Sequence, residues 1–379
     1  MPVSRRGFLR TLAAGTVAGS AATWAGSVGA LASVSRRTER DHEGYLLLDS
    51  NENAYGPSDK VLEAVQSAVG SLHRYPFREY DALVDDLARL HRVSADRVLL
   101  GCGSTDLLRA AAAAFAGPGR KVVTASPTFE DLSTYAQVMG AEVVVVPLTP
   151  TFAHDLSAML DRANRAAALV YICNPNNPTA SITPRAEIES FLRQLPQSCA
   201  VLIDEAYHHY VNASARYISF LDQPVQDERV IVLRTFSKIY AMAGLRLGYA
   251  VADPKLIAKL RSQLTDIDLN GIAVAAGRAA LIDDEAVRNA VKRNTDDRQE
   301  FFNQAMARML KPIDSQTNFV MMDAHQPADH VIEHFLNHKI RIGRHFPPLT
   351  RHVRISLGTP DAMREFWRVW DLMPRVMSM

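Results

Sequence analysis

"VIVLRTFSKIYAMAGLRLGYAV", residues 230 to 251, contains two apolar runs separated by a loop. The runs 230–233 and 247–251 are continuously apolar, which is typical of strands buried on both faces of a parallel sheet. Lys238 and Arg246 lie in the loop between them. Ligands of open α/β sheets bind beyond the carboxyl ends of the strands, so this loop is a candidate binding site. A lysine held there loses solvation, which lowers its pKa and makes its amine a nucleophile towards a carbonyl.

Similar apolar runs recur along the preceding half of the chain and alternate with helical patterns. They cover residues 98–100, 121–125, 142–146, 168–173 and 200–203. Together with the two opening runs they predict a mostly parallel, seven-stranded sheet with helices on both faces, which is a three-layer αβα domain. Between two of these strands, Ser104 is expected to cap a helix that runs to Phe115 and ends at the glycines of 117–119.

The pattern changes after about residue 255. An amphipathic helical stretch covers 284–310, and strand-like runs follow at 318–323, 339–343 and 352–358, before a closing helix from Thr359. These elements predict a second, smaller α+β domain. We therefore expect a large domain over 76–265 and a small domain over 266–379. The segment 33–75 is expected to contribute to the small domain, crossing from one domain to the other near residues 45–57.

The N-terminus has the composition of an export signal. "SRRGFLR" (residues 4–10) precedes a segment rich in Ala and Gly that ends at "ALA" (30–32), and the arginine pair resembles a twin-arginine signal. Residues 1–32 are therefore expected to direct the chain, already folded, to the periplasm or the outside of the cell. Membrane contact is then only transient, and an uncleaved anchor is the alternative.

The bulk composition excludes several classes of partner. The 42 Lys and Arg residues nearly cancel the 41 Asp and Glu residues, which does not favour nucleic acid or an anionic membrane surface as a partner. Three cysteines, Cys102, Cys173 and Cys199, lie in or beside apolar runs and are expected to be core thiols. No Cys/His spacing resembles a metal site.

The ends of the other predicted strands carry further candidate residues. In "GCGSTD", Gly103, Ser104 and Thr105 place N–H groups at a helix N-terminus, which suits a phosphate. Asn177 lies in the turn "NPNNPT" after residue 173, and Asp204 and Tyr207 lie in "DEAY" after residue 203. A carboxylate at the end of a buried strand needs a cation or a strong donor to remain ionised.

These motifs carry a resemblance to a known family. "TFSKIYAMAGLRLGY", together with "NPNNPT", "DEAY" and "RYP", resembles the fold type I aminotransferases of class I/II that use pyridoxal 5'-phosphate. Within that class, the motifs are most similar to those of the histidinol-phosphate aminotransferase group. The likeness covers nearly the whole chain after the export signal. It implies a cofactor enzyme that is loaded in the cytoplasm before export.

The resemblance also implies a role for each candidate residue. Lys238 would bind the cofactor aldehyde and act as acid and base, and Asp204 would hold the pyridinium nitrogen protonated. Asn177 and Tyr207 would contact the phenolic oxygen, and Phe129 would stack on the ring. The expected phosphate ligands are Gly103, Ser104, Thr105, Thr235, Ser237, Arg246 and Tyr75. In the family the residue matched by Tyr75 reaches the phosphate of the neighbouring subunit, so a homodimer is expected, with the segment 33–75 contributing to the dimer contact.

The expected substrates are an amino donor and a 2-oxo-acid acceptor. The resemblance implies that Arg354 binds the substrate carboxylate, and that Asn53 and Tyr55 belong to a segment that folds over the substrate. Arg344 lies about one position from the arginine that holds the substrate phosphate in histidinol-phosphate enzymes. Histidine biosynthesis is cytoplasmic, so an exported enzyme favours a general amino-acid transaminase, although a histidinol-phosphate-like amine stays open.

Two rival functions follow from the same residues. One is another reaction at the substrate Cα, such as that of a β-lyase or a racemase, because the fold and the cofactor motifs do not determine which bond breaks. The other is a non-catalytic binding protein that has kept the scaffold.

Overall fold

The computed structural model describes residues 40–163, 167–211, 216–265 and 269–374. The expected export signal at residues 1–32 lies outside these ranges. Within them, the strands form one seven-stranded, one three-stranded and one two-stranded sheet. The predicted α/β class, with a large sheet and a separate smaller domain, is confirmed.

The large sheet contains the seven predicted strands. They are β2 (Val98–Gly101), β3 (Lys121–Ser126), β4 (Glu142–Pro147), β5 (Ala167–Cys173), β6 (Ala200–Asp204), β7 (Val230–Thr235) and β8 (Gly248–Val251). Their order across the sheet is β2-β8-β7-β6-β5-β3-β4. Strand β8 runs antiparallel to both of its neighbours, and every other pairing is parallel. The carboxyl ends of β6 and β7 therefore lie side by side, which places the loops after Asp204 and Thr235 together.

Helices cover both faces of this sheet, so its strands are apolar throughout. One face packs on α5 (Ser104–Phe115), α6 (Asp131–Val138) and α9 (Pro254–Arg261). The other packs on α4 (Phe77–His91), α7 (Leu156–Arg162), α8 (Arg185–Gln194) and α10 (Gly271–Leu281). Along β6, Val201 and Ile203 enter one core, while Ala200 and Leu202 enter the other. This alternation of buried residues on two faces produces the continuous apolar run.

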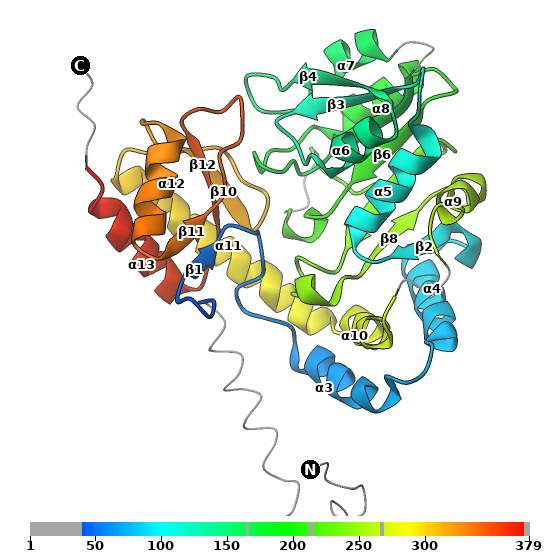
Figure 1. Cartoon of the computed structure of the whole chain (residues 1–379), viewed down its shortest axis with the longest axis horizontal. Helices are drawn as coiled ribbons and strands as arrows, with labels where there is room; N and C mark the ends of the chain where they lie inside the picture. Colours follow the sequence, from blue (N-terminus) through cyan, green and yellow to red (C-terminus); the bar gives the residue numbers. More distant parts are fainter. Residues whose placement is uncertain (1–39, 164–166, 212–215, 266–268, 375–379) are drawn as a thin grey trace, which may run out of the picture. The chain divides into compact units, whose positions relative to one another are not determined.

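The smaller domain has its own core. It contains α11 (Asp284–Ala307), β9 (Lys311–Pro312), β10 (Phe319–Asp323), α12 (Ala328–Asn337), β11 (Ile340–Ile342), β12 (His352–Ser356) and α13 (Pro360–Asp371). Aromatic side chains fill its centre, where the rings of Phe335 and Phe366 stack with centroids 4.8 Å apart. Figure 1 shows these elements in yellow to red, with the blue β1 (Leu46–Leu48) beside β11. Strand β1 pairs with β11 in parallel, so an N-terminal strand completes this domain.

The chain crosses between the two domains directly after β1. Helix α3 (Asp59–Ala68) packs against α10, and α10 also packs against α4. The sequence assigned residues from 266 onwards to the small domain, but the buried side chains of α10 belong to the core of the large sheet. Gly277 of α10 allows this close packing, because a Cβ there would lie 2.4 Å from Leu247. Apart from the side chains of β1, the small-domain core begins within α11, at Phe301.

The helix after β2 begins differently from the prediction. Gly103, with φ of +77°, occupies the N-cap. Ser104 is the first residue of the helix, and no side chain caps the helix with a hydrogen bond. The expectation that Ser104 caps this helix is therefore wrong. A glycine is needed at the N-cap because the backbone there has positive φ and passes close to another side chain.

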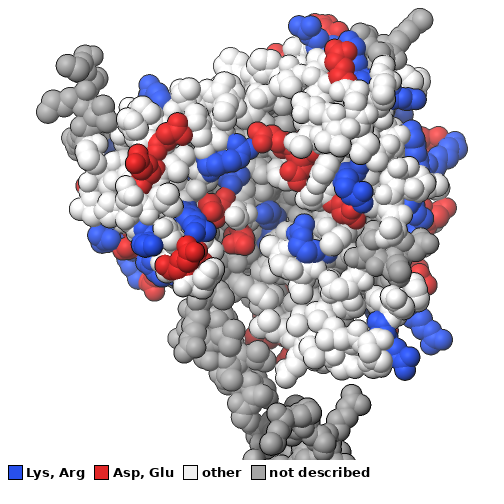
Figure 2. All heavy atoms as spheres, in the orientation of Figure 1, with Lys and Arg blue, Asp and Glu red and all other residues white. Residues whose placement is uncertain are grey.

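Other expectations from composition can be compared with the described residues. Cys173 and Cys199 are buried and Cys102 is partly buried, and all three are free thiols. Within the described ranges, no helix combines the length and apolarity needed to cross a bilayer. Figure 2 shows acidic and basic side chains interspersed over the displayed face, in keeping with the net charge of +1.

Candidate functional site

Lys238 follows β7 and contacts the segment that comes after β1. Its Nζ donates a hydrogen bond to the backbone oxygen of Ser50 at 3.0 Å and lies 5.8 Å from the centre of the Tyr207 ring. Loss of solvation lowers the pKa of Lys238 to about 8, and the positive charge of Arg354 acts in the same direction. A substantial fraction of the amine is therefore neutral near physiological pH and able to attack a carbonyl carbon.

Asp204 ends the neighbouring strand β6 and is buried. Its carboxylate accepts hydrogen bonds from the Tyr171 hydroxyl at 2.9 Å and from the Ala206 N–H at 3.1 Å. Burial raises the pKa of Asp204 to about 6, although both hydrogen bonds oppose the shift. Among the described residues, the groups that lower this pKa are these hydrogen-bond donors, and no cation is among them. A cationic group from a ligand would therefore stabilise its charged form.

A group of donors converges at the N-terminus of α5. Arg246 Nη1 lies 3.5 Å from Ser237 Oγ and 3.0 Å from the Ala243 oxygen, and Thr235 Oγ1 lies 3.0 Å from Ser237 Oγ. A Cβ on Gly103 would lie 2.3 Å from Arg246 Nη2, so the guanidinium rests directly against the start of the helix. Backbone N–H groups, hydroxyls and a guanidinium in one place suit an anionic group such as a phosphate.

A second glycine brings the antiparallel strand against the same helix. A Cβ on Gly248 would lie 2.4 Å from the Ser104 nitrogen. The loop from β7 to β8 contains the short 3₁₀ turn η5 (Ala243–Leu245) and returns the chain to this point. Thr105, one residue further along α5, directs its hydroxyl to the Asp131 carboxylate. The hydroxyl of Thr105 is therefore already hydrogen-bonded to a carboxylate beside the anion site.

Arg354 lies in β12 and is 8% exposed. Its Nη1 donates to Asn177 Oδ1 at 2.7 Å, and its Nη2 donates to the backbone oxygen of Asp49. Its Nε is buried without a hydrogen-bond partner in the structure. Both acceptors are uncharged, so this guanidinium has no carboxylate partner among the described residues. A buried arginine with a spare donor is suited to an anionic group of a ligand.

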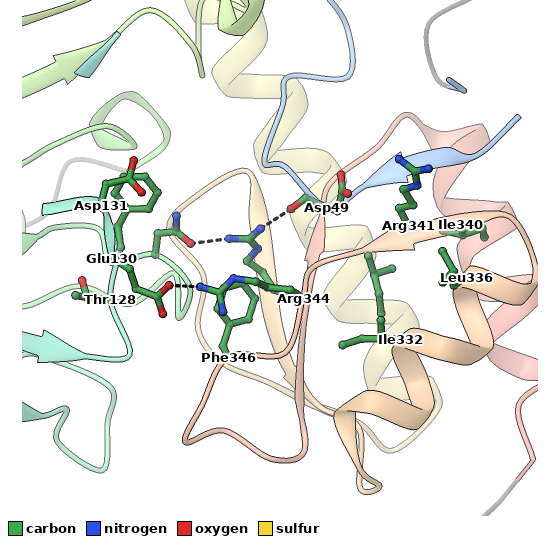
Figure 3. Close-up of a pocket in the computed structure, with 14 residues that line it drawn as sticks. Asp49, Thr128, Glu130, Asp131, Ile332, Leu336, Ile340, Arg341, Arg344 and Phe346 are labelled. Atoms are coloured by element: carbon green, nitrogen blue, oxygen red, sulfur yellow. Dashed lines mark hydrogen bonds and ion pairs between the residues drawn. The ribbon is translucent and has the colours of Figure 1, made fainter. Parts of the chain in front are cut away.

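A cavity of about 590 Å³ lies beside Arg354. Its polar lining residues are Asp49, Thr128, Glu130, Asp131, Asn177, Arg341, Arg344 and Arg354. Phe129 and Phe346 line it together with Ile332, Leu336, Ile340 and Ile342. Figure 3 shows Glu130 and Arg344 pointing towards each other across this cavity, where they form an ion pair. The volume suits a small organic molecule that is bound at one end by Arg354.

Tyr207 and Asn177 connect this cavity to the lysine. The Tyr207 hydroxyl accepts a hydrogen bond from Asn51 Nδ2 at 3.0 Å, and burial raises the pKa of Tyr207, so it stays protonated and keeps its proton for donation. The Oδ1 atom of Asn177 is used by Arg354. Its amide nitrogen is therefore the group that can donate to a ligand between Asn177 and Tyr207.

Three predicted residues have their main contacts away from these groups. Asn53 donates to the Ile239 oxygen at 3.0 Å. This bond joins the crossing segment, the residues between β1 and α3, to the residue after Lys238. The Tyr55 hydroxyl donates to Asp297 of α11 at 2.8 Å, on the side of a separate small cavity. Tyr75 is 70% exposed and contacts the Phe77 ring.

Sequence reasoning missed several residues that surround the site. Asn51, with φ of +54°, donates to Tyr207 and receives a hydrogen bond from Asn318 on its backbone oxygen. The sequence indicates Tyr171 only as part of an apolar strand, although its hydroxyl donates a hydrogen bond to Asp204. A tyrosine in a fully buried strand does carry a signal, since a buried hydroxyl needs a partner. Nothing in the local sequence indicates the role of Asn51.

Comparison with known proteins identifies the family. Residues 43–369 match the model of aminotransferase class I and II. The chain belongs to the class I and II aminotransferases. A histidinol-phosphate aminotransferase of Symbiobacterium thermophilum is 37% identical over 324 residues, which are 84% of this chain and 88% of that protein. The histidinol-phosphate aminotransferase of Bacillus subtilis is 35% identical over 333 residues, 87% of this chain and 91% of that protein.

Solved structures agree with this assignment. The crystal structure of a histidinol-phosphate aminotransferase from Sinorhizobium meliloti, in complex with pyridoxal 5'-phosphate, has a TM-score of 0.81 and 28% sequence identity. The alignment covers 86% of this chain and 91% of that chain. This aminotransferase accordingly depends on pyridoxal phosphate and transfers amino groups between amino-acid and 2-oxo-acid substrates.

The residues present fit that cofactor. The donors around Gly103 and Arg246 suit its phosphate, the unpaired carboxylate of Asp204 suits its pyridinium nitrogen, and the amine of Lys238 suits its aldehyde. A Cβ at residue 103 would clash with the Arg246 guanidinium, so only glycine leaves room for this arginine at the start of the helix.

When bound, the cofactor would supply the electron sink that makes the substrate Cα proton acidic. The neutral amine of Lys238 would then be the base that takes this proton, and the ammonium so formed would be the acid that returns it. Asp204, which Tyr171 and Ala206 hold in place, would stabilise a positive charge at the ring nitrogen. Arg354, whose own position is set by Asn177 and Asp49, would orient the substrate through its anionic group.

Proposed function

We propose that this aminotransferase takes an L-amino acid whose carboxylate binds Arg354, passes its amino group to a 2-oxo acid, and accepts bulky or aromatic side chains. The observation that carries the proposal is the buried Arg354, which has uncharged acceptors on two nitrogens and an unpaired Nε. Both substrates carry a carboxylate beside the reacting carbon, so one arginine serves both half-reactions. The apolar lining from α12, β11 and Phe346 supports the preference for bulky side chains.

A histidinol-phosphate-like amine is the second candidate donor. It is favoured by the names of the relatives with identities of 35–37% and by the presence of Arg344 in the cavity. Such an amine carries a phosphate instead of a carboxylate, and Arg354 offers the same donors to either group. Arg344, however, is already paired with Glu130. The amino-acid donor is therefore the first choice.

A panel of donors and acceptors tests this proposal. Purified protein loaded with pyridoxal phosphate is incubated with phenylalanine, leucine, glutamate or histidinol phosphate, each without an acceptor, with phenylpyruvate or 4-methyl-2-oxopentanoate, and with 2-oxoglutarate, and the amino-acid and oxo-acid products are measured. Amino transfer that requires the acceptor supports the proposal. Cysteine without an acceptor tests for a β-lyase, which would release sulfide, ammonia and pyruvate, and inversion of a donor would indicate a racemase. A protein that binds the cofactor but converts no donor would be a binding protein.

We also propose that the aminotransferase is a homodimer in which Tyr75 contributes to the phosphate site of the partner. Support comes from its 70% exposure and from the neighbouring apolar side chains Val69, Leu72 and Phe77, which are 51%, 62% and 55% exposed. Light scattering after gel filtration measures the mass. A monomer of 41.8 kDa that binds the cofactor tightly would contradict the proposal.

Export through a twin-arginine-type signal is a further part of the proposal. It is supported by the arginine pair in "SRRGFLR" and by the Ala- and Gly-rich segment that follows. The full chain, expressed in a bacterium with this pathway, should be recovered outside the cytoplasm. Changing Arg5 and Arg6 together to lysine should retain it inside. Recovery of both forms in the cytoplasm would rule out export.

A further inference from the structure

The residue directly before helix α6 does not cap this helix with its side chain. Glu130 occupies the N-cap position of α6, yet its side chain accepts no hydrogen bond from the helix. Its carboxylate instead forms an ion pair with Arg344, which follows β11 in the other domain. Figure 3 shows this pair directly beside the aromatic ring of Phe346. Arg344 lies over that ring, with its guanidinium carbon 4.4 Å from the ring centre.

The three arginines of the cavity differ in their partners. Arg354 has uncharged acceptors, as described above. Arg341 faces two carboxylates outside the cavity, Asp41 at 3.5 Å and Glu43 at 3.3 Å. Arg344 is therefore the cation, among the described residues that line the cavity, that would be available for a second anionic group of a substrate. Glu130 neutralises it.

Other acidic groups in the cavity act in the same direction. The Asp131 carboxylate lies next to Glu130, and the repulsion between the two contributes to the raised pKa of Asp131 after burial, the larger cause. Asp49 also lines the cavity and accepts a hydrogen bond from the Ser50 hydroxyl at 3.0 Å. The cavity thus combines an apolar lining with three carboxylates and three arginines, of which Arg341 faces carboxylates outside it.

We propose that Glu130 is a specificity-determining residue, which selects substrates with uncharged side chains by occupying Arg344 and repelling a distal carboxylate or phosphate. The inference rests on the proposed function in that Arg354 holds the first anionic group of the substrate. A distal anion that approaches Arg344 must either displace Glu130 or lie beside it. The pair is more than half exposed on both sides, so it can open, but the displaced carboxylate stays attached to the same wall.

The experiment compares two unreactive acids that lack the amino group. 3-Phenylpropionate carries one carboxylate and an apolar end, whereas glutarate carries a second carboxylate in place of that end. The dissociation constants of both are measured by titration calorimetry on the cofactor-loaded protein. In Glu130→Gln the ratio of affinities should shift towards glutarate by about tenfold, because a like charge is removed and Arg344 is released. The same shift should appear as kcat/KM for glutamate relative to phenylalanine.

The double variant Glu130→Gln/Arg344→Gln should lose most of the shift, since the released arginine is absent. Asp371→Asn is the matched control. It removes the carboxylate from an ion pair with Arg308, at 2.7 Å on the C-terminal helix outside the cavity, and should leave the ratio at the wild-type value. A ratio that does not change in Glu130→Gln, or a shift that persists fully in the double variant, would overturn the inference. Binding is measured without turnover. The expected ratios in a protein that transfers no amino group would therefore sink only the proposed function.

Discussion

Lys238 and Asp204 illustrate how burial acts on two opposite charges within one site. Burial lowers the pKa of the lysine to about 8 and raises that of the carboxyl group to about 6. Both shifts favour the uncharged forms. For the lysine this is useful, because the neutral amine is the reactive form. For the aspartate it is a cost that a cationic ligand reverses.

The first prediction concerns the pH dependence of cofactor capture. Apoprotein is mixed with pyridoxal phosphate at pH 6 to 9.5, and the covalent product is trapped by borohydride and weighed by mass spectrometry. Since only the neutral amine reacts, the initial rate should rise with pH, level off above the pKa of about 8, and vanish in Lys238→Ala. The Lys255→Ala variant is the control, because that lysine is exposed and should behave as wild type. A profile still rising at pH 9.5 would contradict the lowered pKa.

The second prediction concerns the stability of the apoprotein. The folded-state pKa of Asp204, about 6, lies above its ordinary value of 3.8, so the folded state binds this proton more tightly. Stability is therefore lost as pH rises from about 4 to about 6, and the full cost is present above pH 6. Asp204→Asn carries no charge and should be more stable than wild type at pH 7.5, by about 1–3 kcal/mol.

Urea unfolding of both apoproteins at pH 5 and 7.5 measures this difference, which should shrink at the lower pH. Added cofactor should stabilise wild type more than the variant, because only wild type offers a carboxylate to the ring nitrogen. An apo variant that is less stable than wild type at pH 7.5 would show that hydrogen bonding, and not charge burial, dominates at Asp204.

The chain that returns from β7 to β8 and the start of α5 are in contact at the candidate phosphate site. Gly248 permits this contact, because a Cβ there would meet the backbone of Ser104 at 2.4 Å and of Gly103 at 2.8 Å. Backbone atoms cannot rotate away as a side chain can. Any side chain at residue 248 therefore separates the strand from the helix.

The third prediction uses a matched pair of glycines in this loop. Gly248→Ala should destabilise the protein by about 1–3 kcal/mol through overpacking and should weaken pyridoxal phosphate binding as the helix start moves. Gly244→Ala should change both quantities little, since a Cβ there has no atom within 4 Å. Urea unfolding and fluorescence titration with the cofactor measure the two effects. Equal effects of the two substitutions would mean that the contact is not limiting.

The sequence predicted the elements better than it predicted their partners. All seven strands of the large sheet were visible as apolar runs, because burial on both faces leaves a local signature. Asp204 and Lys238 stood out because each follows such a run. The antiparallel direction of β8 was not predictable, since an apolar run carries no sign of its direction. It follows from the short return of the chain at residues 243–245.

The contacts of the crossing segment could not be read from the sequence for a different reason. Asn51 and Tyr207 are 156 residues apart, and Arg354 and Asp49 are 305 apart. A contact of this separation leaves no periodic pattern in either segment. Glu130 was overlooked in the same way, because its partner Arg344 lies 214 residues later.

For the molecule as a whole, the exposed apolar side chains around Tyr75 suggest where a second copy binds. The fourth prediction is that Phe77→Asp weakens the proposed dimer by at least about tenfold in dissociation constant, because a charge would be buried in an apolar contact. Leu372→Asp is the control, since Leu372 is equally exposed, at 55%, in another part of the chain. Analytical ultracentrifugation measures the dissociation constants. Equal behaviour of the two variants would place the interface elsewhere.

The hydrogen bonds of the crossing segment also have a consequence for protein synthesis. Asn51 leaves the ribosome early, but its backbone N–H bonds to Ser356, which is made 305 residues later. The backbone oxygen of Ser50, which accepts a hydrogen bond from Lys238, belongs to the same early segment. The surroundings of Lys238 are therefore assembled only when translation is nearly finished. A nascent chain that stalls before Ser356 already contains the reactive lysine, but it lacks the hydrogen bond that holds Asn51 and the neighbouring Ser50 in place beside it.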